Sequence, residues 1–232
     1  MKVSIPFNSS YIAVEFPDHL DIKLLVPRDL PKLVNEVEEV KKALKNPIAS
    51  LPLHKLAKQK NAKNAVIIIS DLTRPVPDKM LVPPILKELN SAGISHVKVV
   101  VATGTHPPPP IKDIEERLGR EAIEYIEEIE IHNPRDKNRL VYVGETSLGN
   151  KVYINKSVYE ADLKIATGCI KPHIIAGYSG GRKSILPGVA GIDTISYNHF
   201  NFLFHENVRP GIVDGNPVSC LLYTSPSPRD RG

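Results

Sequence analysis

Cysteine is scarce in this sequence, because its 232 residues include only Cys169 and Cys220. Two cysteines exclude a disulfide framework and a cysteine-based zinc cluster. Long apolar runs are absent too, and none approaches the roughly 20 residues that span a bilayer. The opening residues, MKVSIP, lack the apolar core of a signal peptide. We therefore predict a cytoplasmic protein that has no membrane partner.

Clustered positive charge is missing as well. The 30 Lys and Arg residues are interspersed with 26 Asp and Glu, which leaves a net charge of +4. A nucleic-acid-binding surface needs basic residues gathered together, so we predict no nucleic-acid partner. The composition, 41% hydrophobic and 24% charged, is typical of a globular protein. The length suits one sizeable α/β domain, or one domain and the beginning of another.

Buried strands that alternate with helices dominate the central part of the sequence. A continuous apolar run at 65–69, a valine-rich segment at 97–101 and a third segment at 162–167 predict buried strands of a parallel sheet. A helix over 79–92 connects the first two strands, which makes a βαβ unit. The predicted fold class is therefore α/β and Rossmann-like, with a mostly parallel sheet flanked by helices.

Weaker patterns predict additional, shorter elements. A strand at 11–16 is followed, after a turn at Pro17, by a second strand at 22–26. Further strands are predicted at 130–132, 140–143 and 152–154. The further helices are predicted at 31–45, 111–118, 121–128 and from 191 through His199.

Polar clusters follow the three predicted buried strands at the point where each strand ends. Asp71 and Arg74 follow the first, His106 the second and His173 the third. Open α/β sheets place ligands at this edge. An Arg can hold a carboxylate with two hydrogen bonds, and a His moves protons near neutral pH. Each cluster alone could be structural, with Asp71 and Arg74 as a local ion pair, but together they predict an active site.

A glycine-rich turn comes next in the chain, at Ser179, Gly180 and Gly181, followed by Arg182 and Lys183. Glycines let backbone N–H groups approach an anion closely, and the cationic side chains would add to its binding. The spacing matches neither a Walker A loop nor a dinucleotide fingerprint. A phosphate site and a tight turn with solvated basic residues both remain open.

The order of these motifs resembles the lactate racemase family. The matching segments are DLTRP at 71–75, TGTH at 103–106, PH at 172–173, AGYSGGRK at 176–183, PG at 187–188, NH at 198–199 and DGNP at 214–217. The resemblance spans about residues 10–218 and is most specific from 173 to 188. It implies a nickel-dependent racemase or epimerase of a small 2-hydroxy acid, with lactate as the default substrate.

The resemblance also implies roles for the polar residues. His106 and His173 match the two acid/base histidines, and Arg74 matches the residue that binds the substrate carboxylate. Lys183 matches the lysine that tethers the cofactor, and His199 matches the protein ligand of the nickel ion. Racemisation needs one base for each enantiomer, so two histidines on opposite sides of a planar 2-oxo acid fit the implied hydride-transfer mechanism.

The implied cofactor is a nickel-pincer nucleotide, the nickel adduct of pyridinium-3,5-bisthiocarboxylic acid mononucleotide, which dedicated cofactor-synthesis enzymes would supply. Ser179, Gly180 and Gly181 are expected to contribute to its binding site. Asp71 is expected to support either Arg74 or the cofactor ribose.

Two departures from the family limit what the resemblance implies. Four prolines at 107–110 follow His106, where family members commonly have an Arg, and a polyproline stretch is stiff. The family's second domain, which closes over the cofactor, is missing. We therefore expect the chain alone to be an inactive, truncated fragment.

The last segment, residues 219–232, does not continue the family pattern. It resembles the conceptual translation of a sequencing-adapter oligonucleotide, so we interpret it as a non-native tail. Residues 1–218 would then form the N-terminal catalytic and cofactor-binding domain. The alternative is an ordinary disordered tail rich in Pro and Ser.

Two other functions compete with the racemase. A zinc-dependent hydrolase would use His106, His173 and His199 as its ligands and would bring their metal-facing nitrogens within about 4 Å of one another. A non-enzymatic phosphate- or nucleotide-binding module would use the glycine turn and would not need the histidines. The remaining histidines are expected to be structural or solvent-exposed: His19, His54, His96, His132 and His205.

Overall fold

The computed structural model describes residues 1–8, 10–26 and 30–225. The chain divides into two units, 1–34 and 35–232, and each is treated by itself. The first unit contains one antiparallel hairpin, in which β1 (Lys2–Phe7) pairs with β2 (Ser10–Glu15). None of the helices in the described ranges is long and apolar enough to cross a membrane.

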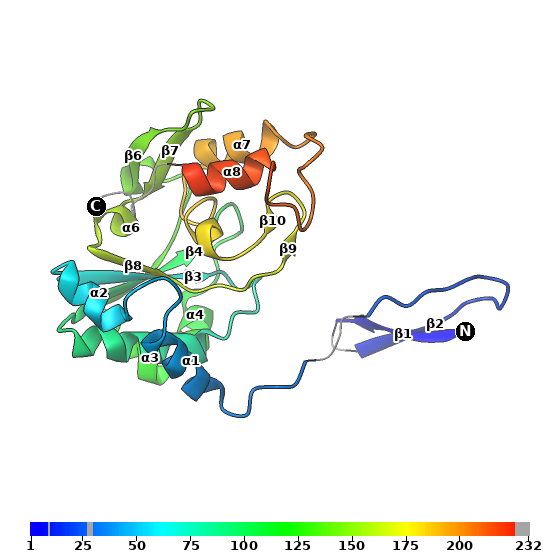
Figure 1. Cartoon of the computed structure of the whole chain (residues 1–232), viewed down its shortest axis with the longest axis horizontal. Helices are drawn as coiled ribbons and strands as arrows, with labels where there is room; N and C mark the ends of the chain where they lie inside the picture. Colours follow the sequence, from blue (N-terminus) through cyan, green and yellow to red (C-terminus); the bar gives the residue numbers. More distant parts are fainter. Residues whose placement is uncertain (9, 27–29, 226–232) are drawn as a thin grey trace. The chain divides into compact units, whose positions relative to one another are not determined.

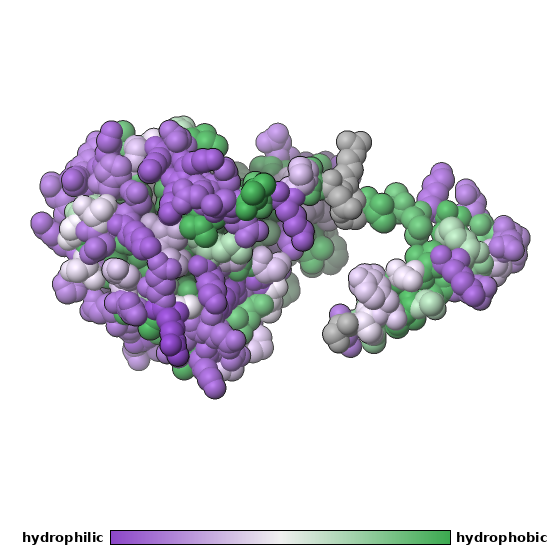
Figure 2. Space-filling model, turned by 90° about the horizontal axis from the view of Figure 1, so that it is seen from below, coloured by the Kyte–Doolittle hydropathy of each residue, from purple (hydrophilic) through white to green (hydrophobic). Residues whose placement is uncertain are grey.

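The hairpin differs from the prediction for this region. β2 confirms the strand predicted at 11–16, but its partner is β1, and the strand predicted at 22–26 is wrong. Asn8 adopts a left-handed conformation with φ of 51°, which Asn tolerates in a turn. Phe7 and Tyr11 are exposed, and Figure 2 shows apolar residues on the surface of this unit.

The second unit contains the predicted α/β domain. Its elements in chain order are α1 (Glu36–Lys45), α2 (Leu53–Gln59), β3 (Asn64–Ser70), α3 (Asp78–Ser91), β4 (His96–Ala102), α4 (Ile111–Leu118), α5 (Arg120–Ile123), β5 (Glu128–Ile131), η1 (Lys137–Arg139), β6 (Leu140–Glu145), β7 (Lys151–Asn155), α6 (Lys156–Glu160), β8 (Leu163–Ala166), β9 (Pro172–His173), β10 (Gly177–Tyr178), η2 (Gly181–Ser184), α7 (Ile192–Phe200) and α8 (Pro217–Thr224). The fold class is confirmed: a parallel four-stranded sheet in the order β5-β4-β3-β8 is flanked by helices and accompanied by short antiparallel strands.

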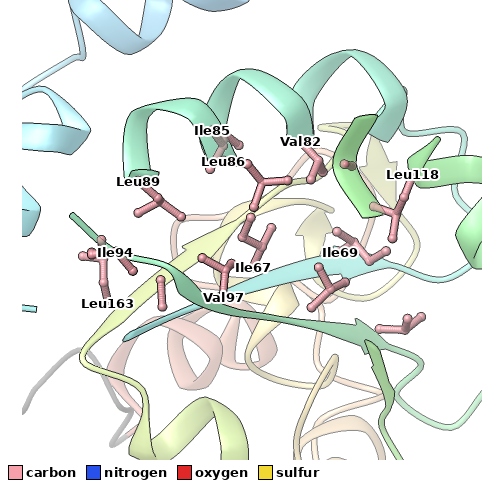
Figure 3. Packing of buried hydrophobic residues seen from close by; sticks show 14 of the residues in the cluster. Ile67, Ile69, Val82, Ile85, Leu86, Leu89, Ile94, Val97, Leu118 and Leu163 are labelled. Atoms are coloured by element: carbon pink, nitrogen blue, oxygen red, sulfur yellow. The ribbon is translucent and has the colours of Figure 1, made fainter. Parts of the chain in front are cut away.

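The sheet lies between two layers, with α1, α3 and α4 on one face and α7 and α8 on the other (Figure 1). Successive residues of β3 point to opposite faces. Ile67 and Ile69 join a core cluster with Leu86 of α3 (Figure 3). Val66 and Ile68 join a second cluster that includes residues of β7, α7 and α8. Burying one such side chain contributes roughly 1.5–3 kcal/mol.

The strand order creates a crevice at one edge of the sheet. β3, β4 and β5 follow one another in one direction, whereas β8 lies on the other side of β3. In open α/β sheets, ligands bind beyond the carboxyl ends of the strands where this direction reverses. The loop that begins at Asp71 and the loop that begins at Thr167 leave the sheet at this point. The topology therefore places two of the predicted polar clusters at the expected ligand site.

Several boundaries differ from the predicted ones for local reasons. α1 begins at Glu36 rather than near residue 31, because the Asn35 side chain accepts a hydrogen bond from the Glu38 N–H and caps the helix there. The helix predicted over 121–128 ends at Ile123. The strand predicted at 130–132 is part of β5, which pairs in parallel with β4 as an edge of the main sheet.

The segment predicted to be a non-native tail begins inside α8. Asn216 caps this helix by accepting a hydrogen bond from the Ser219 N–H. Leu221 and Leu222 are buried, and Leu222 belongs to the second core cluster. Residues 219–225 are thus ordered and packed rather than a disordered tail. That 219–232 is non-native stays a prediction, and residues 226–232 lie outside the described residues.

Candidate active site

A cavity of about 290 Å³ opens at the crevice between the ends of β3, β4 and β8. Gly181, one of the residues predicted from the sequence, lies outside its lining, while its neighbour Gly180 lies within it. The other predicted site residues all line the cavity: Asp71, Arg74, His106, His173, Ser179, Gly180, Lys183 and His199. The structure therefore brings together side chains that are up to 128 positions apart in the sequence, counted from Asp71 to His199.

Asp71 and His106 form a hydrogen-bonded pair at the ends of β3 and β4. The Nδ1 atom of His106 lies 2.5 Å from Oδ2 of Asp71. The other carboxylate oxygen accepts hydrogen bonds from the Thr73 N–H at 2.8 Å and the Thr73 hydroxyl at 2.5 Å. The carboxylate contacts His106 and Thr73 rather than Arg74, so the alternative of a local Asp71–Arg74 ion pair is wrong.

These contacts determine the protonation of the pair. Burial raises the pKa of Asp71, but the hydrogen bonds from Thr73 and His106 outweigh burial and hold that pKa below its usual value. An ionised carboxylate can only accept a hydrogen bond, so Nδ1 of His106 carries the proton and its N–H donates a hydrogen bond to Asp71. When the ring is neutral, its Nε2 has a free lone pair. His106 is therefore arranged as a proton acceptor.

His173 is held in the opposite way. The backbone N–H groups of Ile175 and Ala176 donate to its Nδ1 at 3.3 and 3.2 Å. Because an N–H can only donate, the proton of the neutral ring is on Nε2. That Nε2 lies 3.1 Å from Nζ of Lys183. A ring N–H and an ammonium group are both donors, so this contact is a hydrogen bond only when the Lys183 amine is neutral.

Burial and crowded positive charge favour the neutral forms of both groups. Burial, followed by the charges of Lys183 and Arg74, lowers the pKa of His173 to about 4. Burial, followed by the charges of Arg74 and Arg182, lowers the pKa of Lys183 to about 8. A neutral lysine amine is a nucleophile. The cationic groups around it favour an anionic ligand in the cavity.

His199 contributes a further imidazole from α7. Burial, followed by the charge of Lys183, lowers its pKa to about 4, although a hydrogen bond with the backbone of Ile195 opposes this shift. A buried, neutral imidazole is suited to bind a metal ion such as Ni²⁺.

The turn at 177–181 positions His173 and Lys183. Gly177 pairs with His173 across the β9–β10 hairpin and has φ of 72°. A Cβ at Gly177 would lie 2.1 Å from the carbonyl oxygen of Ile212, so only glycine fits there. The Ser179 hydroxyl donates to the carbonyl of Cys169 at 2.7 Å. Ser179 thus joins the end of the β9–β10 hairpin to the segment that precedes it.

The zinc alternative gains no support from this arrangement. It requires three converging imidazoles, and residues 1–8, 10–26 and 30–225 contain no group of three or more His, Cys, Asp or Glu side chains placed to hold a metal ion. The five remaining histidines are not among the residues that line the cavity. His132, for example, is buried with Nε2 2.9 Å from the carbonyl oxygen of Ala190.

Sequence reasoning missed Thr73 as a contributor to the site. Thr73 lies inside the DLTRP motif, and an Asp followed two positions later by Thr is a recognisable turn signal. That local signal could have identified its hydrogen bonds to Asp71. The prolines at 107–110 lead from His106 directly into α4, which begins at Ile111.

Fold and site together define a class of protein: an α/β domain whose switch-point cavity holds an arginine, a lysine and two neutral histidines beside a carboxylate-bound histidine. Comparison with known proteins gives the family. A family model described as the lactate racemase N-terminal domain matches residues 7–211. The chain therefore belongs to the lactate racemase family.

Curated relatives and solved structures agree with this assignment. The chain is 39% identical to the lactate racemase of Thermoanaerobacterium thermosaccharolyticum and 38% identical to that of Lactiplantibacillus plantarum, in each case over 94% of this chain. These matches cover 51% and 52% of the two relatives, so the chain spans about half their length. The structure of the apoprotein of the first relative superposes with a TM-score of 0.83 at 35% identity, covering 97% of this chain and 52% of that one.

Proposed function

We propose that this chain is the N-terminal, catalytic domain of a nickel-dependent racemase or epimerase that acts on a small 2-hydroxy acid, with lactate as the default substrate. One observation carries the proposal: His106, His173, Lys183 and His199 line a single cavity in a member of the lactate racemase family. A phosphate-binding module would need the glycine turn but none of these histidines.

The residues present fit a lysine-tethered nickel-pincer nucleotide. Lys183 offers a buried amine whose lowered pKa of about 8 leaves it available for a covalent link. His199 offers a buried imidazole whose lowered pKa keeps it neutral, the form that binds nickel. Gly180 and the cationic side chains around it suit the nucleotide phosphate. When bound, the cofactor supplies a reversible acceptor for the hydride on the substrate Cα.

The protein's own side chains then bind the substrate carboxylate and transfer the hydroxyl proton. Arg74 lines the cavity and binds the substrate carboxylate. His106, with Nδ1–H held by Asp71, takes the hydroxyl proton of one enantiomer through Nε2. His173 is the second acid/base group: once its ring has taken up a proton, it returns one to the oxygen when the other enantiomer forms. The reverse reaction exchanges these roles, so at the start of each turnover one ring is neutral and the other is protonated.

The test is intact and peptide mass spectrometry after coexpression with cofactor-synthesis enzymes. The proposal predicts a nucleotide adduct on Lys183 and one bound nickel ion per chain. The variant K183R keeps the charge and is expected to carry no adduct. Racemase activity with an unmodified Lys183, in the holoenzyme that joins this chain to the further half of its curated relatives, would contradict the proposal. We also propose that turnover needs the further half that the curated relatives have, so this chain alone is expected to show none.

A further inference from the structure

Arg117 of α4 contacts the loop that carries Asp71 and Arg74. Its Nη1 donates to the carbonyl of Asp71 at 2.8 Å, and its Nη2 donates to the carbonyls of Arg74 at 3.1 Å and Val76 at 3.2 Å. One guanidinium therefore binds three carbonyls within a six-residue stretch, 71–76. The side chain of Arg117 is 13% exposed, and its bonds to Asp71 and Val76 are partly buried.

The same guanidinium connects this loop to the end of β8. Nη2 of Arg117 lies 2.7 Å from Oδ2 of Asp78, whose side chain is fully buried. The other oxygen of Asp78 accepts a hydrogen bond from the Thr167 hydroxyl at 2.9 Å. Thr167 directly follows β8, ahead of the segment that carries His173 and Lys183. Arg117 and Asp78 thus join the two loops on either side of the crevice.

Between its buried ends, Asp71 and Val76, the 71–76 loop is exposed, so packing does not fix the positions of residues 72–75. Within the loop, short-range backbone bonds join Arg74 N to Asp71 O and Val76 N to Arg74 O. These bonds define the turn, and the contacts of Asp71 and Thr73 with His106 link it to the end of β4. Arg117 adds the bonds that hold the loop carbonyls from the side of α4.

We propose that Arg117 is a positioning residue for the cavity: it holds the 71–76 loop in the orientation in which Asp71 meets Nδ1 of His106 and Arg74 faces the cavity. The planar guanidinium supplies several donors in fixed directions, which a lysine ammonium at this position cannot reproduce. The kinetic consequence rests on the proposed function, but the effect on His106 is a property of the chain itself and is measured without any cofactor.

The test uses nitrogen NMR of histidine side chains in the whole chain, comparing the wild type with R117K and R117Q. In the wild type, His106 is expected to carry its proton on Nδ1. In R117Q the loop relaxes and the signal moves to a mixture of Nδ1–H and Nε2–H forms, with a smaller change in R117K. In the holoenzyme, R117K is expected to lower kcat/KM on the order of 10- to 100-fold, as small misplacements of reacting groups do.

A matched control separates positioning from general stability. Arg139 pairs with the buried carboxylate of Glu130 at 3.3 Å and belongs to a segment outside the cavity lining. R139Q is expected to lower the thermal midpoint but to leave the His106 signal unchanged. If R117Q does not fold, R117K decides the question by itself. A folded R117K protein with an unchanged His106 signal would overturn the proposal, whether or not the lysine adduct forms.

Discussion

The two histidines of the cavity, His106 and His173, are held by opposite kinds of partner at the same ring atom. A carboxylate accepts from Nδ1 of His106, whereas two backbone N–H groups donate to Nδ1 of His173. The proton of the neutral ring is therefore on Nδ1 in one residue and on Nε2 in the other. The difference shows how one fold can hold two identical side chains as different tautomers within a single cavity.

The largest effect is expected from Asp71→Asn, which removes the partner that distinguishes His106. An amide can donate to Nδ1, so the ring loses its fixed tautomer, and racemisation by the holoenzyme should fall by roughly three to four orders of magnitude. Asp136→Asn is the matched control, because Asp136 makes the same bond to an N–H two residues on, at 3.1 Å, outside the cavity lining. Equal losses for both variants would contradict the account.

The other side of the comparison is tested by Gly177→Ala, which disturbs the hairpin that holds His173. A Cβ would lie 2.1 Å from the Ile212 carbonyl oxygen at a positive φ, so we expect a loss of about 3 kcal/mol in unfolding free energy. Gly93→Ala is the control: φ is 87°, but the space is open, so only the backbone strain of about 1 kcal/mol applies. Urea denaturation measures both losses. Similar midpoints for the two variants would show that the close contact with Ile212 does not lower stability.

Acid should lower the stability of the folded chain through His173 and His199. His173 and His199 have pKa values of about 4, below the usual 6.5, so the unfolded chain binds more protons between these values. The free energy of unfolding should therefore fall as the pH drops from 6.5 toward 4. The expected loss at pH 5 is about 1 kcal/mol per histidine, which includes a reduction for solvent screening of these partly exposed rings. Urea midpoints at pH 7 and pH 5 measure this. The double variant H173N/H199N should lose less on acidification than the wild type; equal losses would refute the assignment.

The smallest expected effect is that of Thr73→Val, which keeps the Asp71–His106 contact but removes the hydroxyl bond to Asp71. Losing one such bond costs about 1 kcal/mol, so the rate should fall about fivefold. Thr73→Ser, which retains the hydroxyl, serves as the rescue. If Val and Ser behave alike in steady-state kinetics, Thr73 does not support the carboxylate.

Sequence patterns predicted the sheet well where the pattern is local. β3 contains an uninterrupted apolar run and β4 is rich in valine, as expected of strands that are covered on both faces. The prediction failed at 22–26, because an apolar stretch can read as a strand whether or not a partner exists. The strand predicted at 130–132 overlaps β5, but its parallel pairing with β4 was not predicted, since strand pairing is a long-range property.

The candidate site, too, was predicted where the pattern is local and missed where it depends on long-range contacts. Its members follow strand ends, so topology and motif order were enough to predict that Asp71, His106 and His173 would meet. The tautomers depend on which atoms of distant segments come within hydrogen-bonding distance, and sequence spacing does not encode this. Arg117 was missed for that reason: it lies on α4 without a motif of its own, and its role comes from contacts with residues about 40 positions earlier.

Nitrogen NMR of the histidine side chains near pH 7.5 tests the central claim most directly. The account predicts that His106 carries its proton on Nδ1 and His173 carries its proton on Nε2, with the assignments made from H106N and H173N. Two rings with the same tautomer, or rapid exchange between tautomers in both, would contradict the assignment of one histidine as acceptor and the other as donor.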